Sequence, residues 1–174
     1  MQLRRVPVLG QRARRRRLFW VRCPRALDQG RFLTEHSQLP SDGLTLEVIN
    51  LYELPTRDLG TFDVVLFHGL LYHLPDPITG LKIAADHCAE LIVVNTATKS
   101  GMPDGYLAVA EESTTALLSG THGLNWLPTG PAVITRMLRW IGFVETRVLW
   151  WHQETGDGWG RLEMVASKRD GILG

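Results

Sequence analysis

The stretch Phe62 to Pro77, FDVVLFHGLLYHLPDP, is the most informative part of the chain. Its apolar residues Val64 to Phe67 run without alternation, which predicts a strand from about Asp63 to Phe67 that is buried on both faces of a sheet. A small-residue break at His68-Gly69 follows. Asp76-Pro77 then has the composition of an N-cap and a first helical turn. Strand, loop and helix in this order are typical of an open α/β sheet, where ligands bind beyond the carboxyl ends of the strands.

Strand and helix patterns alternate on both sides of this stretch. Strands are predicted at 44–50, 91–95, 143–151 and 159–167, and helices at 24–37, 77–89 and 130–141. In the helix at 77–89, one face is expected to carry Ile78, Leu81, Ala85 and Cys88. Gly142 stands where a helix C-terminal glycine belongs. The pattern predicts an α/β fold with a doubly wound, mostly parallel sheet.

Two segments between these elements need separate interpretation: the link between the last two strands and residues 96–124. The short link between the last two strands predicts an antiparallel C-terminal hairpin, and the G-x-G-x-G of 156–160 is interpreted as its turn because no helix follows it. Residues 96–124 are poorly patterned apart from an expected short helix at 111–118. The length of this segment exceeds an ordinary connection, so we expect a lid or substrate loop there.

Composition indicates a soluble globular domain with a sizeable core. The chain has 174 residues, of which 44% are hydrophobic and 21% are charged. Apolar runs stay well short of the ~20 residues of a membrane span. Only two cysteines are present, Cys23 and Cys88, which argues against a disulfide framework and favours a cytoplasmic location.

The chain begins with a basic head, residues 1–22, which we separate from a domain at 23–174. Residues 1–27 hold nine arginines and no acidic residue, whereas the remainder has ten basic and eighteen acidic residues. The head is interpreted as disordered or non-native sequence, as a nucleic-acid contact, or as a targeting segment. Guanidinium groups pair with phosphates, so the candidate nucleic-acid contacts are Arg12, Arg14, Arg15, Arg16 and Arg17.

Several stretches together resemble the class I S-adenosylmethionine (SAM) dependent methyltransferases, and in particular the branch similar to the tRNA wobble-uridine carboxymethyltransferases. The fourth-strand motif of that family is similar to FHGLLYH at Phe67–His73. Cys23–His36 resembles the helix that follows the family's second strand, and Val48–Leu54 resembles its third strand with the loop beneath the adenine ring. Asn125–Val148 resembles its late helix and sixth strand. The resemblance implies a Rossmann-like methyltransferase fold and SAM as the cofactor.

The resemblance also implies a set of site residues. It places the cofactor's adenine beside Asn50, Leu51, Tyr52 and Glu53, and the methionine side of the cofactor beside Phe67, His68 and Gly69. Tyr72 and His73 are the candidate catalytic residues: the tyrosine for contact with the sulfonium, the histidine to orient a nucleophile or to take its proton. The structural alternatives are an ordinary polar loop after a strand and a hydrogen-bonded histidine near a helix start.

One part of the family pattern is missing from the sequence. The family grips SAM with a glycine-rich turn after its first strand and with an acid at the end of its second, and residues 1–23 offer neither. We therefore expect a fold that is incomplete at its N-terminus, a truncated domain, weak SAM binding and little turnover. The unpaired strands that remain are expected to be completed by residues 18–23 or by a partner, or else to leave the chain marginally stable.

Two functions remain open at this stage. The favoured one is a SAM-dependent methyltransferase domain, of low activity, that acts on an unidentified small molecule or RNA. The alternative is a non-catalytic methyltransferase-like module that binds RNA or a protein through the basic head. No metal site is expected, because His68 and His73 are five residues apart and do not match a helical zinc pair. Hydrolase chemistry is disfavoured by the lack of a G-x-S-x-G motif.

Overall fold

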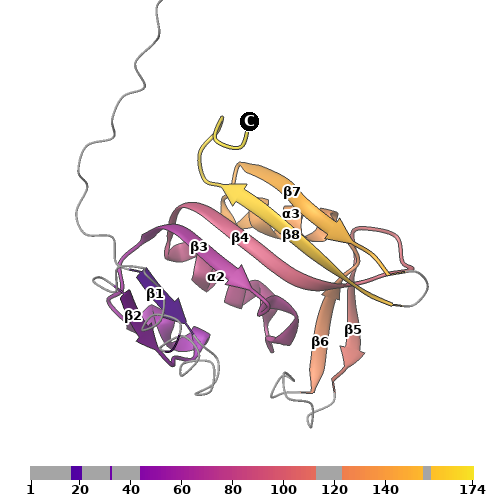
Figure 1. The fold of residues 1–174 in the computed structure, drawn as a ribbon, viewed down its shortest axis with the longest axis horizontal. Helices are drawn as coiled ribbons and strands as arrows, with labels where there is room; N and C mark the ends of the chain where they lie inside the picture. Colours follow the sequence, from indigo (N-terminus) through magenta and orange to yellow (C-terminus); the bar gives the residue numbers. More distant parts are fainter. Residues whose placement is uncertain (1–16, 21–31, 33–43, 113–122, 155–157) are drawn as a thin grey trace, which may run out of the picture. The chain divides into compact units, whose positions relative to one another are not determined.

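The computed structural model describes residues 17–20, 32, 44–112, 123–154 and 158–174 (Figure 1). They belong to two compact units, Met1–Asn50 and Leu51–Gly174. In the first unit, β1 (Arg17–Trp20) pairs in parallel with β2 (Leu44–Glu47). This pairing agrees with one of the three expectations for the unpaired strands, namely that residues near Leu18 supply a strand. Of the predicted helix at 24–37 only Phe32 is described, as a helical residue, and the boundary after residue 22 lies outside the described residues.

The second unit is built on a four-stranded mixed sheet with the order β3-β4-β8-β7. Strands β3 (Phe62–His68) and β4 (Cys88–Lys99) are parallel. Strand β8 (Trp159–Ser167) runs antiparallel to β4 and to β7 (Glu145–His152). The predicted C-terminal antiparallel hairpin is therefore confirmed.

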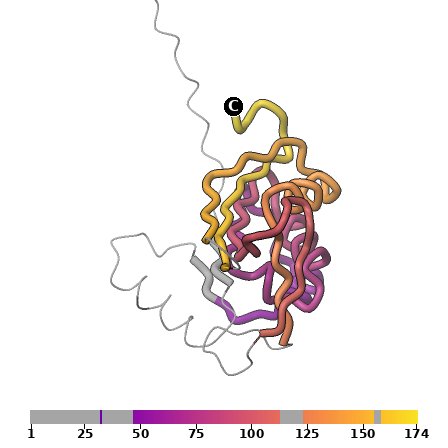
Figure 2. Tube along the Cα trace, turned by 90° about the vertical axis from the view of Figure 1, so that its right-hand side faces the viewer, coloured from indigo at the N-terminus to yellow at the C-terminus, as the bar shows by residue number. Residues whose placement is uncertain are grey.

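Helices α2 (Pro77–Asp86) and α3 (Pro131–Ile141) contact each other and lie on the same face of this sheet. Figure 1 shows both helices behind the strands, and Figure 2 shows α3 and strands β7 and β8 in separate layers from the side. The core forms between the helices and the sheet; its fully buried side chains include Leu81, Ile92, Val94, Ile134 and Leu138. Burial of such side chains is the main driving force of folding.

The opposite face of the sheet corrects two sequence predictions. Strand β3 exists, but it is not buried on both faces, because Val64 is 48% and Leu66 is 60% exposed. Among the described residues, both α-helices that pack on this sheet lie on the other face. The helix predicted at 77–89 ends at Asp86, so Cys88 belongs to β4 and not to the helix, and Ile78 is 41% exposed.

The segment 96–124 contains structure that its pattern did not indicate. Its first residues extend β4 to Lys99, and β5 (Leu107–Glu111) forms an antiparallel hairpin with β6 (Leu124–Pro128). Glu111 is a strand residue, so the short helix predicted from that position is wrong at its start, and residues 113–118 lie outside the described part. Two short 3₁₀ helices, η1 (Leu51–Thr56) and η2 (Leu71–His73), complete the unit.

The predicted N-cap of α2 and the predicted C-terminal glycine of α3 are confirmed. The Asp76 side chain accepts a hydrogen bond from the Thr79 N–H at 3.0 Å, as an N-cap does. Gly142 has a φ of 114°, and its N–H donates to the carbonyl oxygens of Leu138 and Arg139. Gly80 allows α2 to pack closely against Leu74, because a Cβ at position 80 would lie 2.4 Å from the Leu74 side chain.

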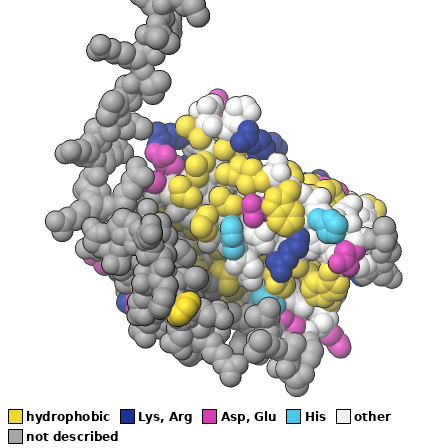
Figure 3. Space-filling model, viewed as in Figure 1, with side chains coloured by type: hydrophobic (Ala, Val, Ile, Leu, Met, Phe, Trp, Pro, Cys, Tyr) yellow, Lys and Arg dark blue, Asp and Glu magenta, His cyan; other side chains and the backbone are white. Residues whose placement is uncertain are grey.

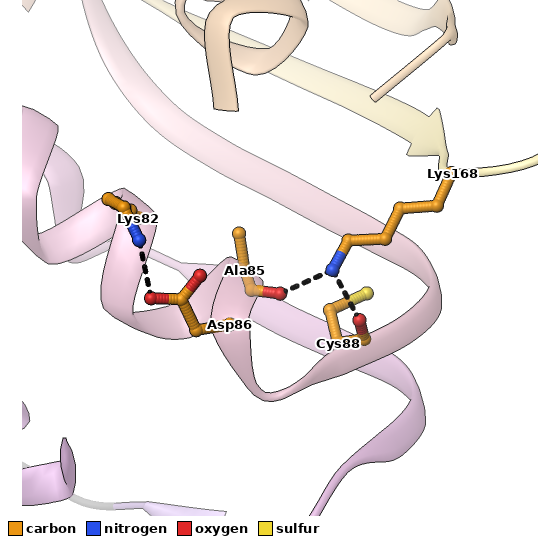
Figure 4. A network of polar contacts seen from close by, with 5 residues as sticks. All are labelled: Lys82, Ala85, Asp86, Cys88 and Lys168. Atoms are coloured by element: carbon orange, nitrogen blue, oxygen red, sulfur yellow. Dashed lines mark hydrogen bonds and ion pairs between the residues drawn. The ribbon is translucent and has the colours of Figure 1, made fainter. Parts of the chain in front are cut away.

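Lys168, just after β8, ties the sheet to the end of α2. Figure 4 shows its ammonium group between the carbonyl oxygens of Ala85 and Cys88, at 2.8 and 2.6 Å. The same ammonium lies 5.6 Å from the centre of the Phe143 ring. A cation that hydrogen-bonds the last carbonyls of a helix also compensates the helix dipole.

We predict that Lys168→Met destabilises the fold, because it keeps the aliphatic stem and removes the charged donor. Loss of charge-assisted hydrogen bonds to carbonyl groups should lower the free energy of unfolding by about 2 kcal/mol, measured by urea denaturation. The matched control is Lys82→Met, since Lys82 forms an exposed pair with Asp86 at 2.7 Å on the same helix. That change should cost under about 0.5 kcal/mol. Equal effects of the two variants would contradict the role given to Lys168.

We predict that the N-cap of α2 makes stability dependent on pH. The hydrogen bonds from Thr79 hold the pKa of Asp76 below its ordinary value of 3.8 in the folded state. As the pH falls, the unfolded chain therefore takes up a proton on Asp76 at a higher pH than the folded chain does. The stabilising contribution of Asp76 is complete above pH 3.8 and is lost as the pH falls through the lowered folded-state pKa. Asp76→Ala should cost about 1 kcal/mol at neutral pH. Asp76→Asn should retain most of the cap but flatten the acid dependence in thermal melts.

Candidate functional site

The carboxyl end of β3 is where the sequence predicted a site, and glycine shapes it. His68, the last residue of β3, lies opposite Asn95 of β4, and the Gly69 N–H donates to the Asn95 carbonyl oxygen at 2.8 Å. Gly69 has a φ of 67°, a backbone conformation that residues other than glycine rarely adopt. A Cβ at this position would meet no atom within 4 Å, so the backbone is open to a ligand. The chain then turns into η2, which carries Tyr72 and His73.

His73 forms a buried pair with a residue that the sequence analysis missed. Its Nδ1 lies 2.7 Å from Oε1 of Glu112, within ion-pair distance but without the angles of a hydrogen bond, and the two side chains are only 9% and 7% exposed. The rings of Tyr72 and His73 are 3.9 Å apart. Glu112 follows β5, and its second oxygen, Oε2, is buried without a hydrogen-bond partner in the described part of the chain. Burying a carboxylate is costly unless it is paired, so such a group is a candidate for function.

The β5–β6 hairpin places a second polar group beside Glu112. Ala110 pairs with Asn125, and the Glu112 N–H bonds the Gly123 carbonyl oxygen. Because side chains alternate along a strand, Glu112 and Asn125 face the same side of the hairpin. Asn125 is 3% exposed, and its Oδ1 is also buried without a partner among the described residues. Strand β6 contacts η2, so these polar groups gather around the helix that carries His73.

A polar network joins Tyr72 to β4 and β8. The guanidinium of Arg161 lies over the Tyr72 ring, 5.6 Å from its centre, and donates to Oδ1 of Asn95 at 3.3 Å. Asn95 in turn donates to Glu163 at 3.0 Å. The β4–β8 register causes this arrangement, because it places Asn95 opposite Glu163 and Ala97 opposite Arg161. The network holds Tyr72 at the point where β3 ends and β4 continues.

A shallow, open depression of 230 Å³ lies next to Tyr72. It is lined by Tyr72, Ala97, His152, Glu154, Trp159, Gly160 and Arg161. Figure 3 views this face of the molecule and shows basic, acidic and histidine side chains among apolar ones. Most of the lining comes from β4 and β8 where they run beyond His68, so the depression lies past the carboxyl end of β3.

The structure places the predicted cofactor residues in different surroundings. Phe67 is 2% and Leu51 is 3% exposed, and both belong to the core. The Tyr52 hydroxyl donates to the Asp76 carbonyl oxygen at 2.8 Å and accepts from its N–H at 3.1 Å, and burial raises the pKa of Tyr52. Glu53 and His68 are exposed. Asn50 is exposed too, and it is the last residue of the first unit.

Other predicted contacts fall partly outside the described residues. Of the five arginines proposed to contact nucleic acid, only Arg17 is described, as the first residue of β1.

In the described part, no group of three or more His, Cys, Asp or Glu side chains is arranged to hold a metal ion. Burial raises the pKa of the Cys88 thiol. No helix among the described residues has the length and apolar character needed to cross a membrane.

Comparisons with known proteins place this fold among methyltransferases. No family model matches the chain, and no curated protein matches it either. The N-terminal domain of EvdMO1, crystallised in the presence of S-adenosylhomocysteine (SAH) and D-fucose, is similar with a TM-score of 0.67 and 25% identity. The match covers 87% of this chain and 66% of that domain, so the chain spans slightly less than two thirds of it.

Two further structures show the same fold at lower identity. An O-methyltransferase family protein from Burkholderia thailandensis has a TM-score of 0.55 and 18% identity, over 88% of this chain and 44% of that one. Magnesium protoporphyrin IX methyltransferase from Synechocystis, with bound SAH, has a TM-score of 0.51 and 12% identity, over 86% of this chain and 63% of that one. The fold is therefore an α/β Rossmann-like methyltransferase fold, as predicted. These neighbours do not single out the branch similar to the tRNA wobble-uridine enzymes.

Proposed function

We propose that this chain is a SAM-dependent methyltransferase domain that transfers a methyl group to a hydroxyl oxygen. The observation that carries the proposal is the buried His73–Glu112 pair, 2.7 Å apart, directly after the strand that ends at His68. A neighbour with the same fold that was crystallised with SAH supports SAM as the cofactor. When bound, SAM supplies a methyl group on a sulfonium centre, and the protein has to position and activate the acceptor.

The residues at the end of β3 fit the cofactor's methionine side. Gly69 offers backbone with no atom within 4 Å of a Cβ position, and the neighbouring His68 is exposed. We propose that these two residues contact the cofactor, with Glu53 as a further contact on the adenine side. Tyr52 and Leu51 support η1 beneath that contact, because the tyrosine hydroxyl is already bonded to Asp76 and the leucine is buried.

The His73–Glu112 pair accounts for the choice of an oxygen acceptor. An alcohol is a weak nucleophile until its proton is removed, so a general base within reach accelerates its methylation. The Glu112 carboxylate beside Nδ1 favours the tautomer that carries its proton there, and this tautomer makes Nε2 the basic nitrogen. His73 then takes the acceptor's proton at Nε2, while Glu112 stabilises the imidazolium that forms.

We predict that the isolated chain binds SAH in calorimetric titration, and that Gly69→Ala weakens binding at least about tenfold. Gly60→Ala is the matched control: its φ is 66°, it too has no atom within 4 Å of a Cβ, and it lies before β3 instead of after it. The backbone strain from φ is nearly the same at both positions, so a larger effect at Gly69 than at Gly60 indicates a ligand contact. The absence of SAH binding by a folded chain would contradict the proposed function.

We predict that His73→Gln and Glu112→Gln lower kcat with SAM and a hydroxyl acceptor by about 10²- to 10⁴-fold, and leave SAH affinity unchanged. SAH release with a panel of hydroxylated compounds measures turnover. In ¹⁵N spectra, the Glu112 variant should also lose the Nδ1–H tautomer of His73. His87→Gln is the control, because His87 hydrogen-bonds Gly60 at the opposite end of β3. Unchanged turnover in both site variants would exclude His73 as the base.

A further inference from the structure

The depression beside Tyr72 has a lining that indicates what kind of acceptor it takes. Its side chains are aromatic, charged or small, and none of the lining residues is Val, Leu, Ile, Met or Phe. The apolar surface of the lining therefore comes from aromatic rings, from Ala97 and from the stems of longer side chains, and not from branched aliphatic side chains. The lining includes Tyr72, whose ring lies 3.9 Å from that of His73, so the tyrosine connects the depression to the proposed base, which does not itself line it.

The aromatic part of the lining is open to a ligand. Trp159, the first residue of β8, is 43% exposed, although a tryptophan usually buries most of its surface. An indole offers a large flat apolar face together with a polar N–H. The C–H groups on one face of a pyranose or furanose ring pack against such a surface, while the ring hydroxyls point outward.

The polar part of the lining combines donors with acceptors. Arg161 has five N–H donors, and its bond to Asn95 uses one of them. Glu154 only accepts when it is ionised, and His152 both donates and accepts. Each hydroxyl of a polyol also donates and accepts, so vicinal hydroxyls match such a set. An anionic acceptor would meet the carboxylate of Glu154, and a cationic one would meet the guanidinium of Arg161.

Gly160 lines the depression with its backbone, because its Cβ position faces the side of the sheet opposite to Ala97 and Arg161. A Cβ at this position would lie 2.4 Å from the carbonyl oxygen of His152 and 2.5 Å from Oγ1 of Thr98, so only glycine fits without a shift of the backbone. Ala97 provides a small side chain. The depression is therefore lined by the small side chain of Ala97, the backbone of Gly160, and aromatic and polar side chains.

We propose that this depression is the acceptor subsite and that it binds a neutral, polyhydroxylated ring such as a monosaccharide unit. The inference rests on the proposed function, because it assigns the ring hydroxyl next to His73 as the group that receives the methyl. Trp159 stacks on the ring, and Arg161, His152 and Glu154 hydrogen-bond its hydroxyls. Arg161 also keeps Tyr72 in place through its contact with the tyrosine ring.

The test is saturation-transfer NMR on the full chain, with and without saturating SAH, using three probes that each contain a six-membered ring. Methyl β-D-galactopyranoside represents a neutral sugar, D-galacturonate an anionic one, and cyclohexanol an apolar alcohol. We expect saturable binding of the neutral sugar, at least about tenfold tighter than that of the other two. Trp159→Ala and Arg161→Gln should each weaken it about tenfold or more, and Trp159→Phe should retain most of it.

Trp140→Ala is the matched control, because Trp140 is 71% exposed on α3 and does not line the depression. Preferred binding of galacturonate or cyclohexanol would overturn the assignment to a neutral sugar, and so would sugar binding that survives both Trp159→Ala and Arg161→Gln. If SAH binds in these cases, the methyltransferase proposal still stands. Conversely, a folded chain that binds the sugar through Trp159 but binds no SAH would support the subsite and contradict the proposed function.

Discussion

The parallel pairing of β3 with β4 determines where everything else in the second unit lies. Strand β3 ends at His68, opposite Asn95, but β4 continues to Lys99 and remains paired with β8 over its whole extension. After the early end of β3, the positive φ of Gly69 turns the chain into η2. Tyr72 and His73 are thus held next to the ends of β4 and β8, where side chains from distant parts of the chain meet.

The most costly feature of this arrangement is the burial of His73 and Glu112. Two ionisable side chains that are less than one tenth exposed lose most of their hydration, and Glu112 retains a buried oxygen without a partner in the described residues. An apolar pair of similar volume would usually stabilise a core as well or better. The burial of this pair is therefore consistent with the proposed catalytic role, in which a carboxylate assists an imidazole that removes a proton from the acceptor.

Prediction of the candidate site from the sequence succeeded for local features and failed for distant ones. The loop from His68 to His73 follows its strand directly, so the sequence pattern alone located it. Glu112 was missed because it is 39 positions from His73 and stands in a segment without periodicity, next to another acid, Glu111. Arg161 and Asn95 were missed for the same reason: only the β4–β8 register brings them together. Double burial was wrongly predicted for β3, because a run of apolar residues does not reveal whether both faces are covered.

The sequence by itself determined the order of the main elements, the capping of α2 by Asp76, the left-handed end of α3 at Gly142 and the position of the loop after β3. All of these depend on residues within a few positions of one another, through hydrogen bonds and backbone preferences that short segments already possess. Only the tertiary structure decided which face of the sheet the helices cover, where α2 gives way to β4, and which side chains surround Tyr72 and His73. These features depend on contacts between residues far apart in the chain, and their free energy comes from burial and strand register, which no local pattern encodes.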